Sequence, residues 1–178
     1  ITLSIENWNA TPPTATFDLY LTAPNDIIYL GNADFVLTFN AANWTNPTIV
    51  KEPTSAPGNC NLKPTDQSGN NSLFLQAAYY NNTAPVSPIV GNEIIINLDG
   101  PTAADLATLN STVAAIDNQP STHRLGTFKM SGITNSSGTM DLAWKLNGTG
   151  VVTYVGTRSN VNFSETAAVI STNIENPP

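Results

Sequence analysis

The sequence predicts an all-β protein, a nine- to ten-stranded antiparallel β-sandwich with one short helix near residues 102–117. The first observation behind this prediction is that apolar and polar residues alternate in many short runs separated by turn residues. The second is composition: Asn, Thr and Ser supply 59 of the 178 residues, while charged residues make up only 11%. Thr fits a pleated strand, and Asn and Ser suit turns, so this composition is typical of a secreted or cell-surface β-protein.

The alternating runs define the strands. In chain order we expect strands at residues 1–6, 17–22, 27–30, 35–39, 73–79, 94–98, 125–130, 140–146, 151–155 and 167–170. Each run has one apolar and one polar face, which predicts two sheets packed face to face. Gly31 and Asn32 signal a turn, and Asn147-Gly148 between two runs is the best hairpin candidate because both residues tolerate a positive φ.

One segment has helical instead of alternating spacing. Between residues 102 and 117 the apolar positions are Leu106, Leu109, Val113 and Ile116. Thr102 and Asp105 resemble a capping box at its start. We therefore expect a short helix that crosses one end of the sandwich.

Residues 1–174 are expected to form a single domain, and residues 175–178 the start of a C-terminal linker or cleaved tail. A chain that begins in a strand suggests a mature protein whose signal peptide has been removed, so we expect it outside the cell or on its surface. No apolar run is long enough for a membrane span. The six basic residues are scattered and the net charge is −7, which argues against nucleic acid as a partner.

Several segments together resemble a known family. They are Phe17-Asp18-Leu19-Tyr20-Leu21, residues 28–40, residues 124–130 and Ala143-Trp144. Their order is similar to that in the cohesin-like β-sandwich modules of secreted surface proteins of Bacteroidota, many of them exported by type IX secretion. The resemblance implies a nine-stranded jelly roll with a small helical insertion, and attachment to or assembly at the cell surface. Cohesins bind dockerins through one sheet face, but no residue of that site can be carried over to this chain.

Catalytic chemistry is not expected. His123 is the only histidine, and its setting is typical of a solvated turn residue. The five glutamates are far apart in sequence and form no acidic motif of the glycosidase kind. With one Cys and one His, zinc and iron sites are nearly excluded.

Two kinds of ligand site remain as hypotheses. Asp26, Asp34 and Asp66 lie among other oxygen donors and are candidates for a structural calcium ion, although such residues are more often ordinary turn residues. Trp8, Trp44 and Tyr80 are candidates for aromatic platforms that bind glycans, or else they cap the ends of the sandwich. Trp144 is in phase with Leu142 and Leu146, which places it in the core.

Cys60, the only cysteine, is either a half-buried small residue or the site of an intermolecular disulfide. It lies within residues 51–71, a stretch rich in Pro, Gly, Asn, Ser and Thr. A loop of that length in a compact domain is often functional.

Three functions compete. The favoured one is a structural or adhesive surface protein that assembles with copies of itself into a filament, sheath or layer. In that hypothesis the terminal strand with Ile1, Leu3 and Ile5 pairs with a neighbour's open sheet edge. The alternatives are a carbohydrate-binding module, with polysaccharide as partner, and a cohesin-type module that docks another surface protein.

Overall fold

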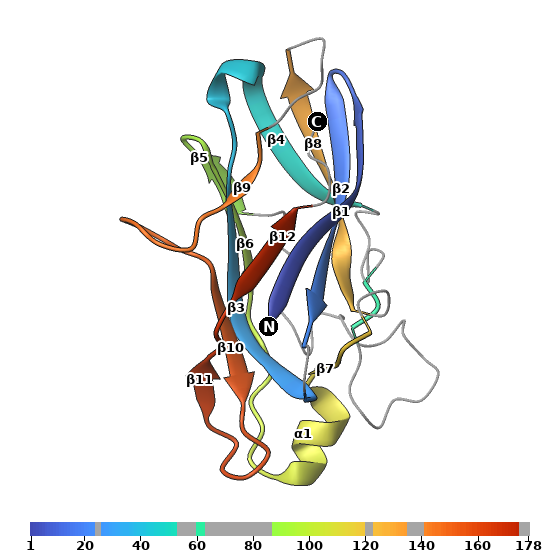
Figure 1. Ribbon diagram of the computed structural model, residues 1–178, viewed down its shortest axis with the longest axis vertical. Helices are drawn as coiled ribbons and strands as arrows, with labels where there is room; N and C mark the ends of the chain where they lie inside the picture. Colours follow the sequence, from blue (N-terminus) through green and yellow to red (C-terminus); the bar gives the residue numbers. More distant parts are fainter. Residues whose placement is uncertain (24–25, 53–59, 63–86, 120–122, 135–140, 175–178) are drawn as a thin grey trace.

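The computed structural model places its strands in two sheets packed face to face, with the helix at one end of the sandwich (Figure 1). The structure describes residues 1–23, 26–52, 60–62, 87–119, 123–134 and 141–174. The predicted strand at 73–79 and most of the 51–71 segment lie outside the described residues. None of the helices in the described ranges is long and apolar enough to cross a membrane.

The first sheet has the strand order β12-β1-β2-β8-β4. Its strands are β1 (Thr2–Thr11), β2 (Thr14–Thr22), β4 (Trp44–Glu52), β8 (Arg124–Ile133) and β12 (Ser171–Ile174). All neighbours pair antiparallel except β1 and β12, which pair in parallel from Thr2 with Ser171 to Ile5 with Ile174. The first and the last described strands therefore lie side by side.

The second sheet has the order β11-β10-β3-β6-β5, and β7 and β9 also pair with β3. Its strands are β3 (Ile28–Thr38), β5 (Ser87–Val90), β6 (Glu93–Leu98), β7 (Ala115–Ile116), β9 (Ala143–Trp144), β10 (Tyr154–Arg158) and β11 (Glu165–Ala167). A 3₁₀ helix, Ala41–Asn43, connects β3 to β4 across the sheets. The predicted sandwich is confirmed.

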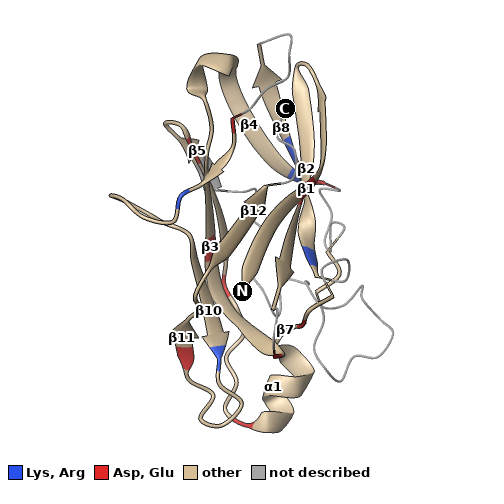
Figure 2. Cartoon of the chain, viewed as in Figure 1, with Lys and Arg blue, Asp and Glu red and all other residues tan. Residues whose placement is uncertain are grey.

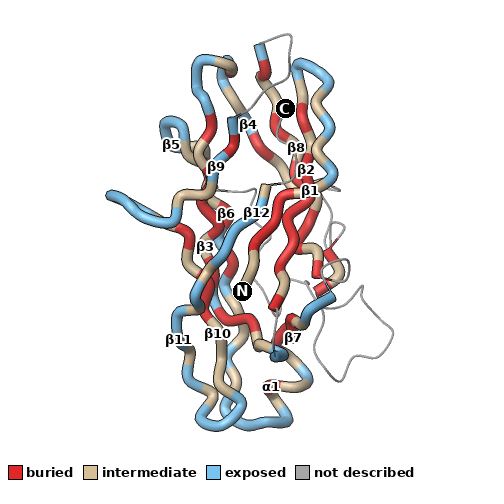
Figure 3. Tube along the Cα trace, viewed as in Figure 1, coloured by how far each residue is buried: buried red, intermediate tan, exposed pale blue. Residues whose placement is uncertain are grey.

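The core lies between the sheets because alternate residues of each strand point inward. Phe17 and Phe128 of the first sheet stack 5.7 Å apart, and Phe35 and Leu37 of β3 are fully buried in the same cluster. Figure 3 shows the buried positions along the strands and the exposed ones in the connecting loops. The alternating pattern in the sequence thus identified the inward face.

One turn prediction was wrong at Gly31 and Asn32. The strand does not stop there, and the two predicted short strands form the single strand β3. Instead the register between β3 and β10 shifts, because residues 31 and 32 of β3 stand opposite Gly156 alone. Gly31 and Asn32, which predict a turn in the sequence, form a bulge within a long strand.

The predicted hairpin at Asn147-Gly148 is also wrong. β9 and β10 do not pair with each other, because both pair with β3, and residues 146–152 project from the body between them (Figure 1). The strand expected at 167–170 is absent as well, because most of that stretch links β11 in one sheet to β12 in the other. Periodicity cannot reveal which strand a segment pairs with.

The helix forms where the sequence predicts but is shorter: α1 spans Leu106–Thr112. Asp105 is its N-cap and accepts a 2.7 Å hydrogen bond from the Thr108 backbone N–H. Ser111 and Thr112 donate their hydroxyls back to carbonyls one turn earlier, which weakens further propagation. Val113 is extended, and Ile116, expected on the helix, lies in β7.

Candidate functional site

Of the candidate aromatic platforms, the structure describes Trp8 and Trp44, and both pack against other rings. Trp44 is only 7% exposed and packs edge-on against Phe39, with ring centroids 5.9 Å apart. Trp8 is half-buried and stacks on Phe17 at 6.2 Å. The expectation of exposure is thus wrong for Trp44, because its ring joins the core at the end of β3. Tyr80 lies outside the described residues.

The calcium candidates do not converge. Asp26 is exposed just before β3, and Asp34 lies within β3, where it accepts a 2.8 Å hydrogen bond from Asn97. Because β3 is one continuous strand, eight residues of extended chain separate the two carboxylates by roughly 25 Å. Asp66 lies outside the described residues. In the described ranges no three Asp, Glu, His or Cys residues come together as metal ligands.

The assembly strand is already paired within its own chain. β1 lies between β2 and β12, and the side chains of Leu3 and Ile5 are fully buried in the core. The terminal amine of Ile1 donates to the Val169 carbonyl at 2.8 Å. The expectation that Ile1, Leu3 and Ile5 offer a free strand is therefore wrong, because the C-terminal strand occupies that edge.

His123 is buried rather than solvated. Its side chain is 7% exposed and its Nε2 lies 3.6 Å from Asp117 Oδ1. The Leu21 backbone N–H donates to the His123 carbonyl, which ties the approach to β8 to the end of β2. This burial cannot be predicted from the local sequence, because it depends on contacts with residues of other elements.

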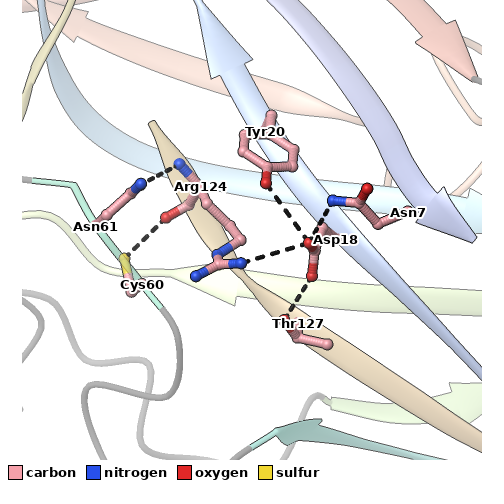
Figure 4. Close-up of polar contacts among 7 residues, drawn as sticks. All are labelled: Asn7, Asp18, Tyr20, Cys60, Asn61, Arg124 and Thr127. Atoms are coloured by element: carbon pink, nitrogen blue, oxygen red, sulfur yellow. Dashed lines mark hydrogen bonds and ion pairs between the residues drawn. The ribbon is translucent and has the colours of Figure 1, made fainter. Parts of the chain in front are cut away.

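A buried carboxylate is the centre of the polar network on the outer face of the first sheet (Figure 4). Asp18 is 6% exposed, although it alternates with the core residues of β2 and points away from them. Asn7 donates its side-chain amide to Asp18 at 2.8 Å, and Thr127 of β8 donates its hydroxyl to the other oxygen. Arg124 lies 3.4 Å away as the counter-ion. Three strands are thus joined through one side chain.

Asn7 reaches Asp18 because β1 is bulged there. Its φ of +53° is left-handed, and the pairing of β1 with β2 shifts between Glu6 and Asn9. Asn tolerates this conformation better than most residues. Tyr20 completes the network, and burial together with the Asp18 charge raises its phenol pKa. With four donors around it, Asp18 is a structural acceptor and not a free base.

Cys60 and Asn61 attach a separate segment to the start of β8. The Asn61 backbone N–H and the Cys60 thiol both donate to the Arg124 carbonyl, at 3.0 and 3.1 Å, and Asn61 Oδ1 accepts from the Arg124 backbone N–H. Burial raises the pKa of the Cys60 thiol to about 12. Cys60 is thus even more buried than the first alternative expected, which favours that alternative over an intermolecular disulfide.

On the second sheet, the Glu165 side chain lies across two strands. A Cβ placed on Gly31 or Gly156 would lie 2.4 or 2.3 Å from a Glu165 carboxylate oxygen, so only glycine leaves room for it. The carboxylate accepts from the Asn32 backbone N–H and the Tyr154 hydroxyl, both at 3.2 Å, and pairs with Arg158 at 3.0 Å. We call Gly31 and Gly156 the glycine pair.

Sequence analysis missed this contact. Arg158 and Glu165 are seven positions apart and face each other across the β10–β11 hairpin. Opposite charges on either side of the turn-rich Ser159–Ser164 stretch are the signal that could have found it. Burial and the Glu165 charge raise the pKa of Tyr154.

The projecting residues 146–152, which we call the excursion loop, are closed at their base. The Thr153 backbone N–H donates to the Lys145 carbonyl at 2.7 Å, and the Thr153 hydroxyl bonds both backbone groups of Val36. The Lys145 ammonium contacts Glu93 at 2.6 Å and donates to the Thr149 carbonyl within the loop at 2.7 Å. The loop is therefore held in one shape.

The excursion loop carries two exposed aliphatic side chains. Leu146 is 42% and Val151 43% exposed. Leu146 also borders a shallow groove of about 280 Å³ whose other walls include Tyr154, Ala167, Ala168 and Ile170. Figure 3 shows this loop standing clear of the sandwich.

The described basic residues do not cluster around the excursion loop, apart from Lys145 at its base. Figure 2 shows basic residues on β4, β8 and β10 and in the segment that follows β9. Three of them contact carboxylates: Arg124, Lys145 and Arg158. The described surface therefore has no stripe of free positive charge of the kind that follows a phosphate backbone.

Comparisons with known proteins find a structural likeness but no sequence match. The sequence matches no protein-family profile, and no curated protein sequence matches it. A chain in the crystal structure of a type II cohesin–X-dockerin complex from Acetivibrio cellulolyticus, an N-terminal interface mutant, is similar to this chain. The TM-score is 0.49 and 7% of residues are identical, over 97% of this chain and 95% of the other. The two-sheet architecture of the present chain is established by its own strand pairing.

Proposed function

We propose that this chain is a non-catalytic module of the cell surface or extracellular space that docks another protein through its excursion loop. The observation that carries this proposal is the loop itself, an ordered projection whose base is clamped by Lys145, Glu93 and Thr153 and whose sides expose Leu146 and Val151. An exposed aliphatic side chain loses hydration on binding. A clamped loop also loses little conformational freedom, which lowers the cost of association.

A protein is the partner that this surface fits best. The Leu146 and Val151 side chains offer no hydrogen-bonding groups, and the walls of the adjoining groove are mostly aliphatic, with Thr153 and Tyr154 as its polar members. Burial of exposed aliphatic surface is a main driving force of protein–protein association. Export and cell-surface attachment remain expectations from composition, and the absence of enzyme activity remains a prediction.

Self-assembly into filaments is the competing proposal, and it needs a contact between copies other than the terminal strand β1. β1 cannot donate itself to a neighbour without leaving both β2 and β12. In the order of the described strands, β12 and β4 lie at the two ends of the first sheet, and β11 and β5 at the two ends of the main path of the second. A copy of this chain docked on the excursion loop is therefore one outcome of the following experiment.

The experiment places a photo-reactive amino acid at Leu146 in the exported chain and, as a matched control, at Val161. Val161 is also an exposed aliphatic residue, but it lies in the β10–β11 turn. We expect one stoichiometric cross-linked protein from the Leu146 position and none from Val161. Leu146→Asp should then weaken binding of that purified partner at least tenfold without lowering the melting temperature.

Two results would contradict docking of a foreign protein at the loop. One is a cross-linked product made only of this chain, which would favour the self-assembling subunit. The other is a partner whose affinity is unchanged by Leu146→Asp and by Val151→Asp.

A further inference from the structure

A second cavity lies at the other end of the same sheet, beside the helix end of the sandwich. It has a volume of about 710 Å³ and is bordered by the start of β3 and the end of β10, with Asp26, Ile27, Tyr29, Arg158 and Asn160 among its walls. Small-molecule sites usually have volumes of about 300–1,000 Å³. None of these residues belongs to the excursion loop.

The guanidinium of Arg158 is the unusual group in this cavity. Its side chain is only 9% exposed, and Glu165 is its one ion-pair partner among the described residues. Its Nε is buried and has no hydrogen-bond partner in the structure. An arginine offers five N–H donors, and a buried donor without an acceptor is costly. The Nε itself is closed to solvent, so it is the terminal nitrogens of the guanidinium that are available to a ligand where Arg158 borders the cavity.

The guanidinium is also fixed in direction. Glu165 holds it from one side, and Glu165 is itself held by Tyr154, the Asn32 backbone and the close fit over the glycine pair. Ser159 holds the loop between β10 and β11, because its hydroxyl accepts hydrogen bonds from the backbone N–H groups of Val161 and Asn162. Such preorganisation is what a binding group requires.

Charge decides the class of ligand. Glu165 already neutralises Arg158, and Asp26 adds a further negative charge at the wall. The whole chain carries −7. An anion would therefore be repelled, whereas a neutral hydroxyl can accept from the guanidinium and donate to a carboxylate. The exposed Ile27 side chain, at 52%, offers an apolar surface beside these polar groups.

We propose that the cavity between Asp26–Tyr29 and Thr157–Asn160 binds a neutral saccharide, with Arg158 donating to its hydroxyl oxygens. A sugar ring combines hydroxyls with an apolar C–H face, which matches the polar groups and the aliphatic wall. The site is independent of the docking proposal and differs from the aromatic platforms expected from the sequence.

The test uses the ¹⁵N-labelled full chain and nuclear magnetic resonance, in which the Arg158 Nε–H gives its own signal. The probes are glucose, galactose, mannose, N-acetylglucosamine and their disaccharides, with galacturonate, inorganic phosphate and calcium alone as comparison. We expect at least one neutral saccharide to shift the Arg158 Nε–H signal and the backbone amides of Ile27 and Asn160, in EDTA as well as without it.

Variants separate binding from folding. Arg158→Gln should weaken the saccharide at least tenfold. If that variant does not fold, Ile27→Ser and Asn160→Ala, both at exposed positions, should each weaken it several-fold. Asn173→Ala on β12 of the other sheet is the control and should change nothing, as should Leu146→Asp.

Three outcomes would overturn the proposal. The first is that no neutral saccharide binds with a Kd below about 10 mM, as measured from the signal shifts. The other two are signal shifts caused only by galacturonate or phosphate, and signal shifts caused only by calcium.

Discussion

The Glu165 carboxylate of β11 lies directly over Gly156 of β10, so closely that a Cβ on Gly156 would be 2.3 Å from Oε1 and 2.9 Å from Cγ. The glutamate cannot keep its bonds to Tyr154, Asn32 and Arg158 if that space is filled. One glycine thus controls the position of the guanidinium in the proposed saccharide site.

We therefore expect Gly156→Ala to lower the free energy of unfolding by about 1–3 kcal/mol, through overpacking and displacement of Glu165. In a Glu165→Ala background the same substitution should cost clearly less, because the clashing side chain is gone. Urea unfolding of the two single variants and the double variant measures this coupling. Additive effects would show that the two residues do not interact as described.

Asn7 offers a test of the Asp18 network. Asn7→Ala removes both the donor to Asp18 and a residue suited to a φ of +53°, so we expect a loss of about 2 kcal/mol. Asn7→Gly removes only the donor and should cost about 1 kcal/mol less than Asn7→Ala. Thermal or urea unfolding distinguishes the two. Equal losses would mean that the left-handed backbone contributes nothing.

Gly132 in β8 tests a backbone contact. A Cβ there would lie 2.4 Å from the Thr45 carbonyl oxygen of β4, and its φ is +104°. We expect Gly132→Ala to destabilise the fold by about 3 kcal/mol, since a backbone atom cannot rotate away. Gly91→Ala is the matched control, because Gly91 has a φ of +63° but no atom within 4 Å of the added Cβ. The control should lose about 1 kcal/mol.

The buried Cys60 thiol should make the free energy of unfolding depend on pH in the alkaline range. Burial raises the pKa of its thiol from 9.0 to about 12, so the folded state holds the proton more tightly than the unfolded state. A raised pKa contributes stability that is complete below the unfolded value and is lost as the pH rises through the folded value. Cys60 should therefore contribute full stability below pH 9 and lose it progressively up to about pH 12.

The measurement compares unfolding free energies of the native chain and Cys60→Ala across that range. Only the unsubstituted chain should show the additional decline in unfolding free energy, because all other groups titrate in the Cys60→Ala variant as well. A thiol reagent should react with native Cys60 far more slowly than with the urea-unfolded chain. Fast reaction in the native state would contradict the burial of the thiol.

The sequence by itself determined which residues of the long strands face the core, although not in the runs 140–146 and 151–155, where Leu146 and Val151 are exposed. Alternation places Phe17, Leu19 and Leu21 inward, and the structure buries all three completely. It also determined the presence and place of the helix, since Asp105 caps α1 where the spacing begins. These features depend on neighbours within a few positions, so a local pattern is sufficient to predict them.

Tertiary structure alone decided which strands pair and which side chains meet. β1 pairs with β12, residues about 170 positions away in the chain, so the terminal strand is not free. β9 and β10 both add to β3, which turns a predicted hairpin into the excursion loop. Arg158 reaches Glu165, and Asn7 reaches Asp18, only once those pairings are fixed. Pairing is set by packing over the whole chain, because alternation specifies a strand's face but not its neighbour.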